Sequence, residues 1–148
     1  MDDLTFHMGK FPAVLPGGLR YARNHMWCRT TGDRHRFGFT AYAVRLMQDV
    51  YFLDWCVNAG DELKLKQQIG HIETSKAQSD LFAPLAGTLA EFNAELLKDP
   101  TAINVENYGA GWLFEMTGDA SAIMTAAQYY QFLEAGWETT QRLLKGHM

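Results

Sequence analysis

Hydrophobic residues along this chain gather in short runs at first and recur at helical spacing near the end. Residues 21–29 and 36–39 are β-prone runs on either side of Thr31-Gly32-Asp33-Arg34, which has turn chemistry, and together they predict a hairpin. Residues 50–57 are rich in aromatic and branched side chains, which favour strands, and residues 58–61 form a turn signal that ends the run. The pattern predicts a mainly β protein.

A short helix and an irregular arm accompany the predicted strands. Thr40 is a suitable N-cap for a helix that ends near Gln48. Its expected inner face consists of residues spaced three or four apart, namely Tyr42, Ala43, Leu46 and Met47. Residues 1–19 contain two prolines and three glycines, which resist both helix and sheet. We therefore expect an irregular N-terminal arm over 1–19.

The C-terminal segment carries the pattern of an amphipathic helix between residues 120 and 144. Its apolar positions recur at three-, four- and seven-residue intervals: Ile123, Ala127, Tyr130, Leu133, Trp137 and Leu144. Asp119 or Ser121 is the expected cap. We predict that residues 119–148 form a helix packed on the single domain of residues 20–118, with partner docking by part of its face as the alternative.

Composition excludes several classes of function. With 148 residues, 47% of them hydrophobic, the chain is long enough for one packed core. The formal net charge is -4 and the thirteen basic residues are scattered, which argues against nucleic acid as a partner. No apolar run approaches the length of a membrane span, no leader-like segment opens the chain, and the two cysteines form no disulfide framework. We expect a cytoplasmic monomer that binds neither membrane nor metal.

The most informative stretch lies between Gly60 and Leu89, with Lys76 near its middle. Residues 70–74 and 80–83 have strand character, whereas the four residues 75–78 are polar and small, as at an exposed hairpin tip. Such a tip would hold the Lys76 amine clear of the core. The alternative is that Lys76 is an ordinary solvated surface charge.

The sequence around this lysine resembles a lipoyl attachment hairpin. It reads Glu-Thr-Ser-Lys-Ala over residues 73–77 and Ser-Asp-Leu-Phe-Ala-Pro-Leu-Ala-Gly-Thr-Leu over residues 79–89. This is similar to glycine-cleavage H proteins and to acyltransferase subunits of 2-oxoacid dehydrogenases. The resemblance maps Lys76 onto the lipoylated lysine, and Glu73 and Gly87 onto features that attaching enzymes read. Biotin-carrying relatives usually flank their lysine with methionines, so Ser75 and Ala77 favour lipoate.

A second motif directs the resemblance to the H-protein family. Asn104 is followed by Tyr108, Gly109, Gly111, Trp112 and Leu113 in the places of the family's Tyr-Gly-x-Gly-Trp-Leu run. Upstream, His25-Met26-Trp27 resembles His-Glu-Trp, and residues 38–43 resemble Gly-Ile-Thr-Asp-Tyr-Ala. The resemblance covers residues 20–118. It implies a flattened β-sandwich (a barrel-sandwich hybrid, H-protein-like) with peripheral helices, here with an added C-terminal amphipathic helix.

This resemblance implies a carrier without catalytic residues, whose lipoate forms an amide with Lys76 and swings between enzymes. Partners would be a lipoate ligase or lipoyl transferase and lipoamide dehydrogenase. Met26 and Ala41 replace acids of the family pattern and both ends are extended, which favours an H-like lipoate-binding protein of sulfur oxidation that serves a heterodisulfide-reductase-like complex. The alternative is glycine cleavage, with its decarboxylase and aminomethyltransferase. Two further alternatives are an unmodified interaction module and a thiol enzyme using Cys28.

Overall fold

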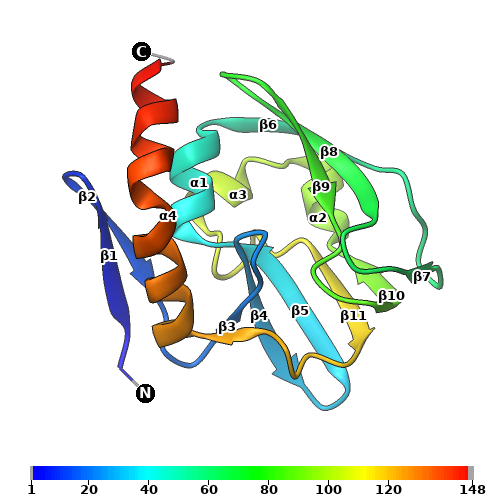
Figure 1. Ribbon diagram of the computed structural model, residues 1–148. Helices are drawn as coiled ribbons and strands as arrows, with labels where there is room; N and C mark the ends of the chain where they lie inside the picture. The colour runs from blue at the N-terminus through cyan, green and yellow to red at the C-terminus, as the bar shows by residue number, and fades with distance from the viewer. Residues whose placement is uncertain (1, 147–148) are drawn as a thin grey trace.

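The computed structural model describes residues 2–146, which form three antiparallel sheets with helices at their edges (Figure 1). The seven-stranded sheet runs in the order β12 (Met124–Thr125), β3 (Arg20–Tyr21), β4 (Met26–Thr31), β5 (Arg34–Phe39), β11 (Phe114–Gly118), β10 (Gly87–Phe92) and β7 (Glu62–Leu63). The three-stranded sheet contains β6 (Val50–Trp55), β8 (Gln68–Thr74) and β9 (Gln78–Phe82). A separate hairpin pairs β1 (Leu4–Met8) with β2 (Phe11–Leu15).

The two larger sheets share one hydrophobic core. Phe37 and Met116 from the seven-stranded sheet belong to the same buried cluster as Leu53 and Ile72 from the three-stranded sheet. Burial of apolar surface from both sheets is the main force that holds such layers together. The predicted mainly β sandwich with peripheral helices is confirmed.

Three short helices connect the strands. Helix α1 (Ala41–Met47) begins as predicted, because the Thr40 side chain accepts a hydrogen bond of 3.2 Å from the Ala43 amide. Helices α2 (Ala94–Lys98) and α3 (Ala102–Val105) follow β10. From α3, the Asn104 amide group accepts from the Val50 N–H and donates to the Val50 carbonyl, both at 2.9 Å. Asn104 thereby anchors the first residue of β6.

Helix α4 (Ala126–Gly146) starts later than the sequence pattern predicts. Its N-terminus is a reciprocal capping box: the Thr125 hydroxyl accepts from the Gln128 N–H at 3.2 Å, and the Gln128 side chain accepts from the Thr125 N–H at 2.9 Å. Asp119, the predicted cap, instead accepts from the Ser121 N–H in a local turn. Within the described residues, no helix is both long and apolar enough to cross a bilayer.

The buried face of α4 packs against the second hydrophobic cluster of the domain. Its innermost residues are Ala126, Tyr129 and Leu133, with Tyr130 and Trp137 partly buried beside them. Of the predicted apolar positions, Ala127 is exposed and the side chain of Leu144 lies outside the described part. The face therefore lies one residue out of phase with the prediction over its first turn.

The prediction of an irregular arm over residues 1–19 is wrong for the hairpin of β1 and β2. Gly9 has φ +64° at the turn, a conformation that glycine adopts without steric cost. Pro12 lies opposite His7, and a two-stranded ribbon tolerates proline because each strand has a free edge. The inward residues Phe6, Met8, Ala13 and Leu15 join Tyr21, Trp27, Tyr129 and Leu133 in a second core cluster. The hairpin thus lies against α4 (Figure 1).

Candidate functional site

Lys76 lies at the tip of the β8–β9 hairpin, which projects from the body of the molecule (Figure 1). The strands pair up to Glu73 opposite Gln78, so the tip consists of the few residues between them. Ser75, Lys76 and Ala77 are all exposed. The predicted tip is confirmed.

Thr74, directly before the tip, is buried and brackets it with hydrogen bonds. Its hydroxyl oxygen accepts from the backbone N–H groups of Lys76 and Ala77, each at 3.2 Å. The same hydroxyl donates to the Ala77 carbonyl at 3.1 Å, and the Thr74 N–H donates to that carbonyl at 2.9 Å. The sequence reading missed this residue, although a threonine before a turn is a known local hydrogen-bonding signal.

The hairpin is supported on its other side by β6. Thr74 pairs with Val50, and the Ser75 hydroxyl lies 3.5 Å from a carboxylate oxygen of Asp49, to which it donates. Gln48 and Asp49 both have a positive φ, at 53° and 37°. Residues other than glycine adopt this backbone conformation at a cost in conformational energy. This strained connection ends α1 and brings the Asp49 carboxylate to the tip.

Glu73 and Gly87, the other predicted site residues, lie in different parts of the fold. Glu73 is half-buried in β8, close to Lys76 in the chain. Gly87 is in β10, where it pairs with Gly118 on β11 and with Leu63 on β7. A Cβ on Gly87 would overlap the Thr117 carbonyl oxygen and lie 3.0 Å from its carbon. Strand packing therefore accounts for this glycine, and its recognition by an attaching enzyme stays a prediction.

Three carboxylates belong to the segments that form and support the tip. Asp49 lies in the connection between α1 and β6, Glu73 lies on β8 and Asp80 lies on β9. Among the described residues, the Lys76 amine makes no hydrogen bond or salt bridge, and no three His, Cys, Asp or Glu side chains gather as metal ligands. The tip therefore offers one primary amine that makes no hydrogen bond or salt bridge within the described residues.

The two cysteines have different environments. Cys28 is buried in β4, and burial raises the pKa of its thiol although a side-chain contact with Thr30 opposes the shift. A raised pKa disfavours the thiolate, which is the nucleophilic form. Cys56 is exposed after β6, with its sulfur 3.6 Å from the Gln68 carbonyl. The burial and raised pKa of Cys28 give no support to the alternative of a thiol enzyme that uses this residue.

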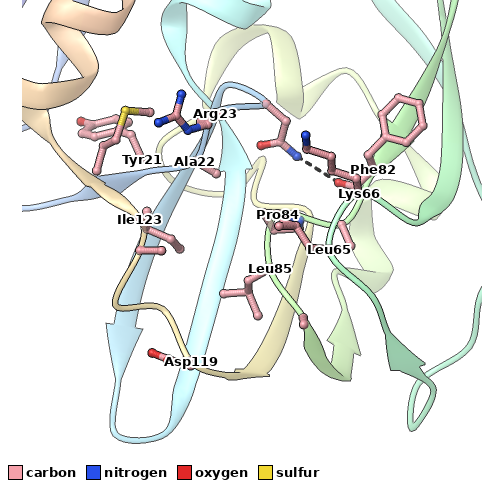
Figure 2. Close-up of a pocket in the computed structure, with 15 residues that line it drawn as sticks. Tyr21, Ala22, Arg23, Leu65, Lys66, Phe82, Pro84, Leu85, Asp119 and Ile123 are labelled. Atoms are coloured by element: carbon pink, nitrogen blue, oxygen red, sulfur yellow. Dashed lines mark hydrogen bonds between the residues drawn. The ribbon is translucent and has the colours of Figure 1, made fainter.

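A groove of about 660 Å³ lies elsewhere on the molecule (Figure 2). It is lined by residues 21–24, 65–66, 82–86 and 122–124 together with Asp119. Arg23 and Lys66 lie on its rim, and the Asn24 side chain donates to the Phe82 carbonyl at 2.9 Å. A strand rises about 3.3 Å per residue, so Phe82 lies roughly 20 Å along the hairpin from Lys76. The groove is separate from the tip.

The residues of the tyrosine–glycine–tryptophan motif have structural roles. The Tyr108 hydroxyl accepts from the Ala41 N–H at 3.0 Å and donates to the Val14 carbonyl at 2.6 Å. The Arg36 guanidinium lies 4.1 Å from the ring centre of Trp112, a cation–π contact. Met26, which replaces an acid of the family pattern, is 1% exposed, so it packs in the core and cannot contact a partner.

Comparison with known proteins gives a consistent result. The family model described as "Glycine cleavage H-protein" matches residues 19–136. A glycine cleavage system H protein of Carboxydothermus hydrogenoformans is 32% identical over 82% of this chain and 96% of its own length. One of Bacteroides thetaiotaomicron is 41% identical over 73% of this chain and 86% of its own. A crystal structure of a glycine cleavage system H protein from Mycobacterium marinum has a TM-score of 0.70 at 31% identity, covering 79% of this chain and 97% of that one.

Proposed function

The chain belongs to the glycine cleavage H-protein family, and on that premise we propose that Lys76 holds its lipoyl group and that the carrier serves glycine cleavage. Proteins of this family carry lipoate on a lysine and have no catalytic activity of their own. The observation that carries the proposal is the position of Lys76, whose amine stands free at an exposed tip braced by strands on both sides.

The residues of the tip fit an amide-linked arm. Lys76 and its neighbours Ser75 and Ala77 are exposed, so an attaching enzyme can reach the amine from several directions. Amide formation removes one positive charge, and no carboxylate of the described chain lies within salt-bridge distance of that charge. When bound, lipoate supplies a disulfide that accepts and releases a transferable group. The chain's own residues hold the root of the arm still.

The proposed partners are those of a shuttle. They are a lipoate ligase or lipoyl transferase, a glycine decarboxylase, an aminomethyltransferase and lipoamide dehydrogenase. Tethering raises the effective concentration of the reactive group at each docked partner, so the carrier needs no active site. Docking must be transient, and the acidic surroundings of Lys76 favour partners with basic surfaces.

Two pathways compete for this carrier. The sequence favours sulfur oxidation because two acids of the family pattern are replaced and both ends are extended. One of the two replaced positions, Met26, is buried, so it cannot contribute to a partner surface. The relatives above are named as glycine cleavage proteins, which supports the aminomethyl shuttle. One observation keeps a sulfur carrier as the second candidate. The β1–β2 hairpin lies before the residues that the family model matches, and it adds a surface with which a different partner could interact.

The proposal for Lys76 is tested by co-expression with a lipoate ligase, followed by intact mass and peptide mapping. We expect one lipoyl increment on the peptide that contains Lys76, none in Lys76→Arg, and normal modification of Lys64→Arg, an exposed control. Because exposed substitutions usually change stability by no more than about 0.5 kcal/mol, both variants should unfold like the parent chain. Modification that persists in Lys76→Arg would contradict the assignment.

The pathway is tested with the lipoylated protein and two sets of partners. Glycine decarboxylation that depends on this carrier, with no turnover by a heterodisulfide-reductase-like sulfur-oxidising complex, is the expected result. The reverse pattern would assign the carrier to sulfur oxidation.

A further inference from the structure

The Thr74 hydroxyl is the point from which the exposed tip is held. We propose that Thr74 is a positioning residue that presents Lys76 to the lipoate-attaching enzyme. The inference rests on the proposed function of Lys76. It concerns a residue that contacts the backbone of the lysine and leaves its amine free.

The hydrogen bonds of Thr74 use the full capacity of its hydroxyl group. A hydroxyl has one donor and two acceptor sites. Here the donor goes to the Ala77 carbonyl at 3.1 Å, and the acceptor sites go to the Lys76 and Ala77 N–H groups at 3.2 Å each. The backbone N–H groups of Lys76 and of the residue after it thus share one side-chain oxygen.

Thr74 is itself held firmly, which makes it an effective anchor. Its side chain is 6% exposed, whereas the three residues after it are exposed. Val50 lies opposite it in β6, and the Asn104 amide fixes both backbone groups of Val50. A β-branched residue also has few χ1 rotamers, so the hydroxyl keeps its direction. The restraint on Lys76 is therefore anchored, through β6, in helix α3.

A fixed root and a free side chain suit the transfer reaction. The neutral Nζ amine of Lys76 attacks the acyl carbon of an activated lipoyl donor, an acyl adenylate or a thioester. One amide bond forms, the bond from the acyl carbon to the leaving oxygen or sulfur breaks, and the surplus proton of the amine leaves to solvent or the leaving group. A root that is already ordered lowers the entropy lost on docking in the enzyme. Thr74 should therefore affect binding of the carrier more than the chemical step.

The experiment compares Thr74→Val, which keeps the shape and removes the hydroxyl, with Thr74→Ser, which keeps the hydroxyl. Ser79→Ala is the matched control, because Ser79 lies on the same hairpin and its hydroxyl makes no hydrogen bond to any described residue. With a lipoate ligase, the Thr74→Val carrier should show a KM raised about five- to tenfold, as expected when the docking-competent arrangement of the tip falls to roughly a fifth to a tenth of the free carrier. Its kcat should change less than about twofold, and the Ser variant should restore KM.

Amide hydrogen exchange gives a second readout, which requires no attaching enzyme. In the parent chain, the N–H groups of Lys76 and Ala77 should exchange at least about fivefold more slowly than the backbone N–H of Ser75, which donates to no acceptor among the described residues. In Thr74→Val this difference should disappear while the strand amides of β8 remain protected.

The outcomes separate this inference from the proposed function. Normal KM in a folded Thr74→Val, or equal exchange at Ser75, Lys76 and Ala77 in the parent, would overturn the positioning role while leaving Lys76 as the lipoylated residue. A raised KM that Thr74→Ser does not restore would also overturn it, because packing of the methyl group would then be responsible. Absence of modification in the parent chain would instead overturn the proposed function.

Discussion

Replacement of Gly87 by alanine separates two explanations of the same residue. The family resemblance makes this glycine a feature that attaching enzymes read, whereas the structure makes it a requirement of strand packing. An added Cβ would overlap the Thr117 carbonyl oxygen and lie 3.1 Å from the Gly118 Cα, both of them backbone atoms of β11. Because no side-chain rotation relieves a clash with backbone, β10 and β11 would have to move apart.

The expected cost follows from that geometry. Overpacking a filled site typically costs about 1–3 kcal/mol, and a contact with backbone belongs in the upper half of this range. A loss of about 2 kcal/mol corresponds to a fall in Tm of roughly 4–8 °C for a chain of this size. Gly136→Ala is the control, since a Cβ there meets no atom within 4 Å and alanine stabilises a helix interior by up to about 1 kcal/mol.

The assay is thermal and urea unfolding of both variants, followed by lipoylation at a temperature where each is folded. Packing predicts that Gly87→Ala loses stability but is modified at the parental rate per folded molecule. A Tm within one degree of the parent would refute the reasoning from strand packing. A stable variant that is modified slowly would assign Gly87 to recognition instead.

Two other regions give independent predictions. Thr125→Ala removes the capping box of α4 and should lower the free energy of unfolding in urea by about 0.5–2 kcal/mol, whereas Ser121→Ala should change it by less than about 0.5 kcal/mol; equal effects would place the helix start near residue 121. His25 hydrogen-bonds Tyr129 at 2.8 Å, and burial lowers its pKa to about 4. Since the unfolded chain then binds a proton that the folded one refuses, stability should fall by up to about 1.4 kcal/mol per pH unit as pH drops from about 6.5 to 4. His25→Asn tolerates the positive φ of 68° at this position and should flatten that slope in unfolding measured across the range; an unchanged slope would show that other groups cause it.

The sequence predicts the tip and α1 well because local chemistry specifies both. Thr40 caps α1 through its own side chain, and the polar residues around Lys76 match an exposed turn. The role of Thr74 could not be assigned in the same way. It depends on the burial of that threonine and its pairing with Val50 of β6, a residue more than twenty positions earlier in the chain.

The sequence mispredicts the N-terminal segment and the start of α4. Pro12 and Gly9 predict irregular structure, yet both are compatible with a two-stranded ribbon whose apolar side packs on α4. The start of α4 is displaced because Asp119 satisfies a local turn, leaving Thr125 and Gln128 to form the cap. The hairpin depends on long-range packing against α4 that no window of sequence contains, whereas the start of α4 follows from a local threonine–glutamine capping box that the sequence interpretation overlooked.

The contact between Tyr108 and the N-terminal hairpin makes the residues before position 19 part of the packed domain. One hydroxyl connects the Val14 carbonyl of β2 to the first amide of α1, so a motif residue of the family has its partner outside the family's boundary at residue 19. Phe6 and Leu15 fill the second core beside Tyr129. The N-terminal hairpin thus covers one side of this core, and a fragment that began at residue 19 would expose aromatic side chains to water.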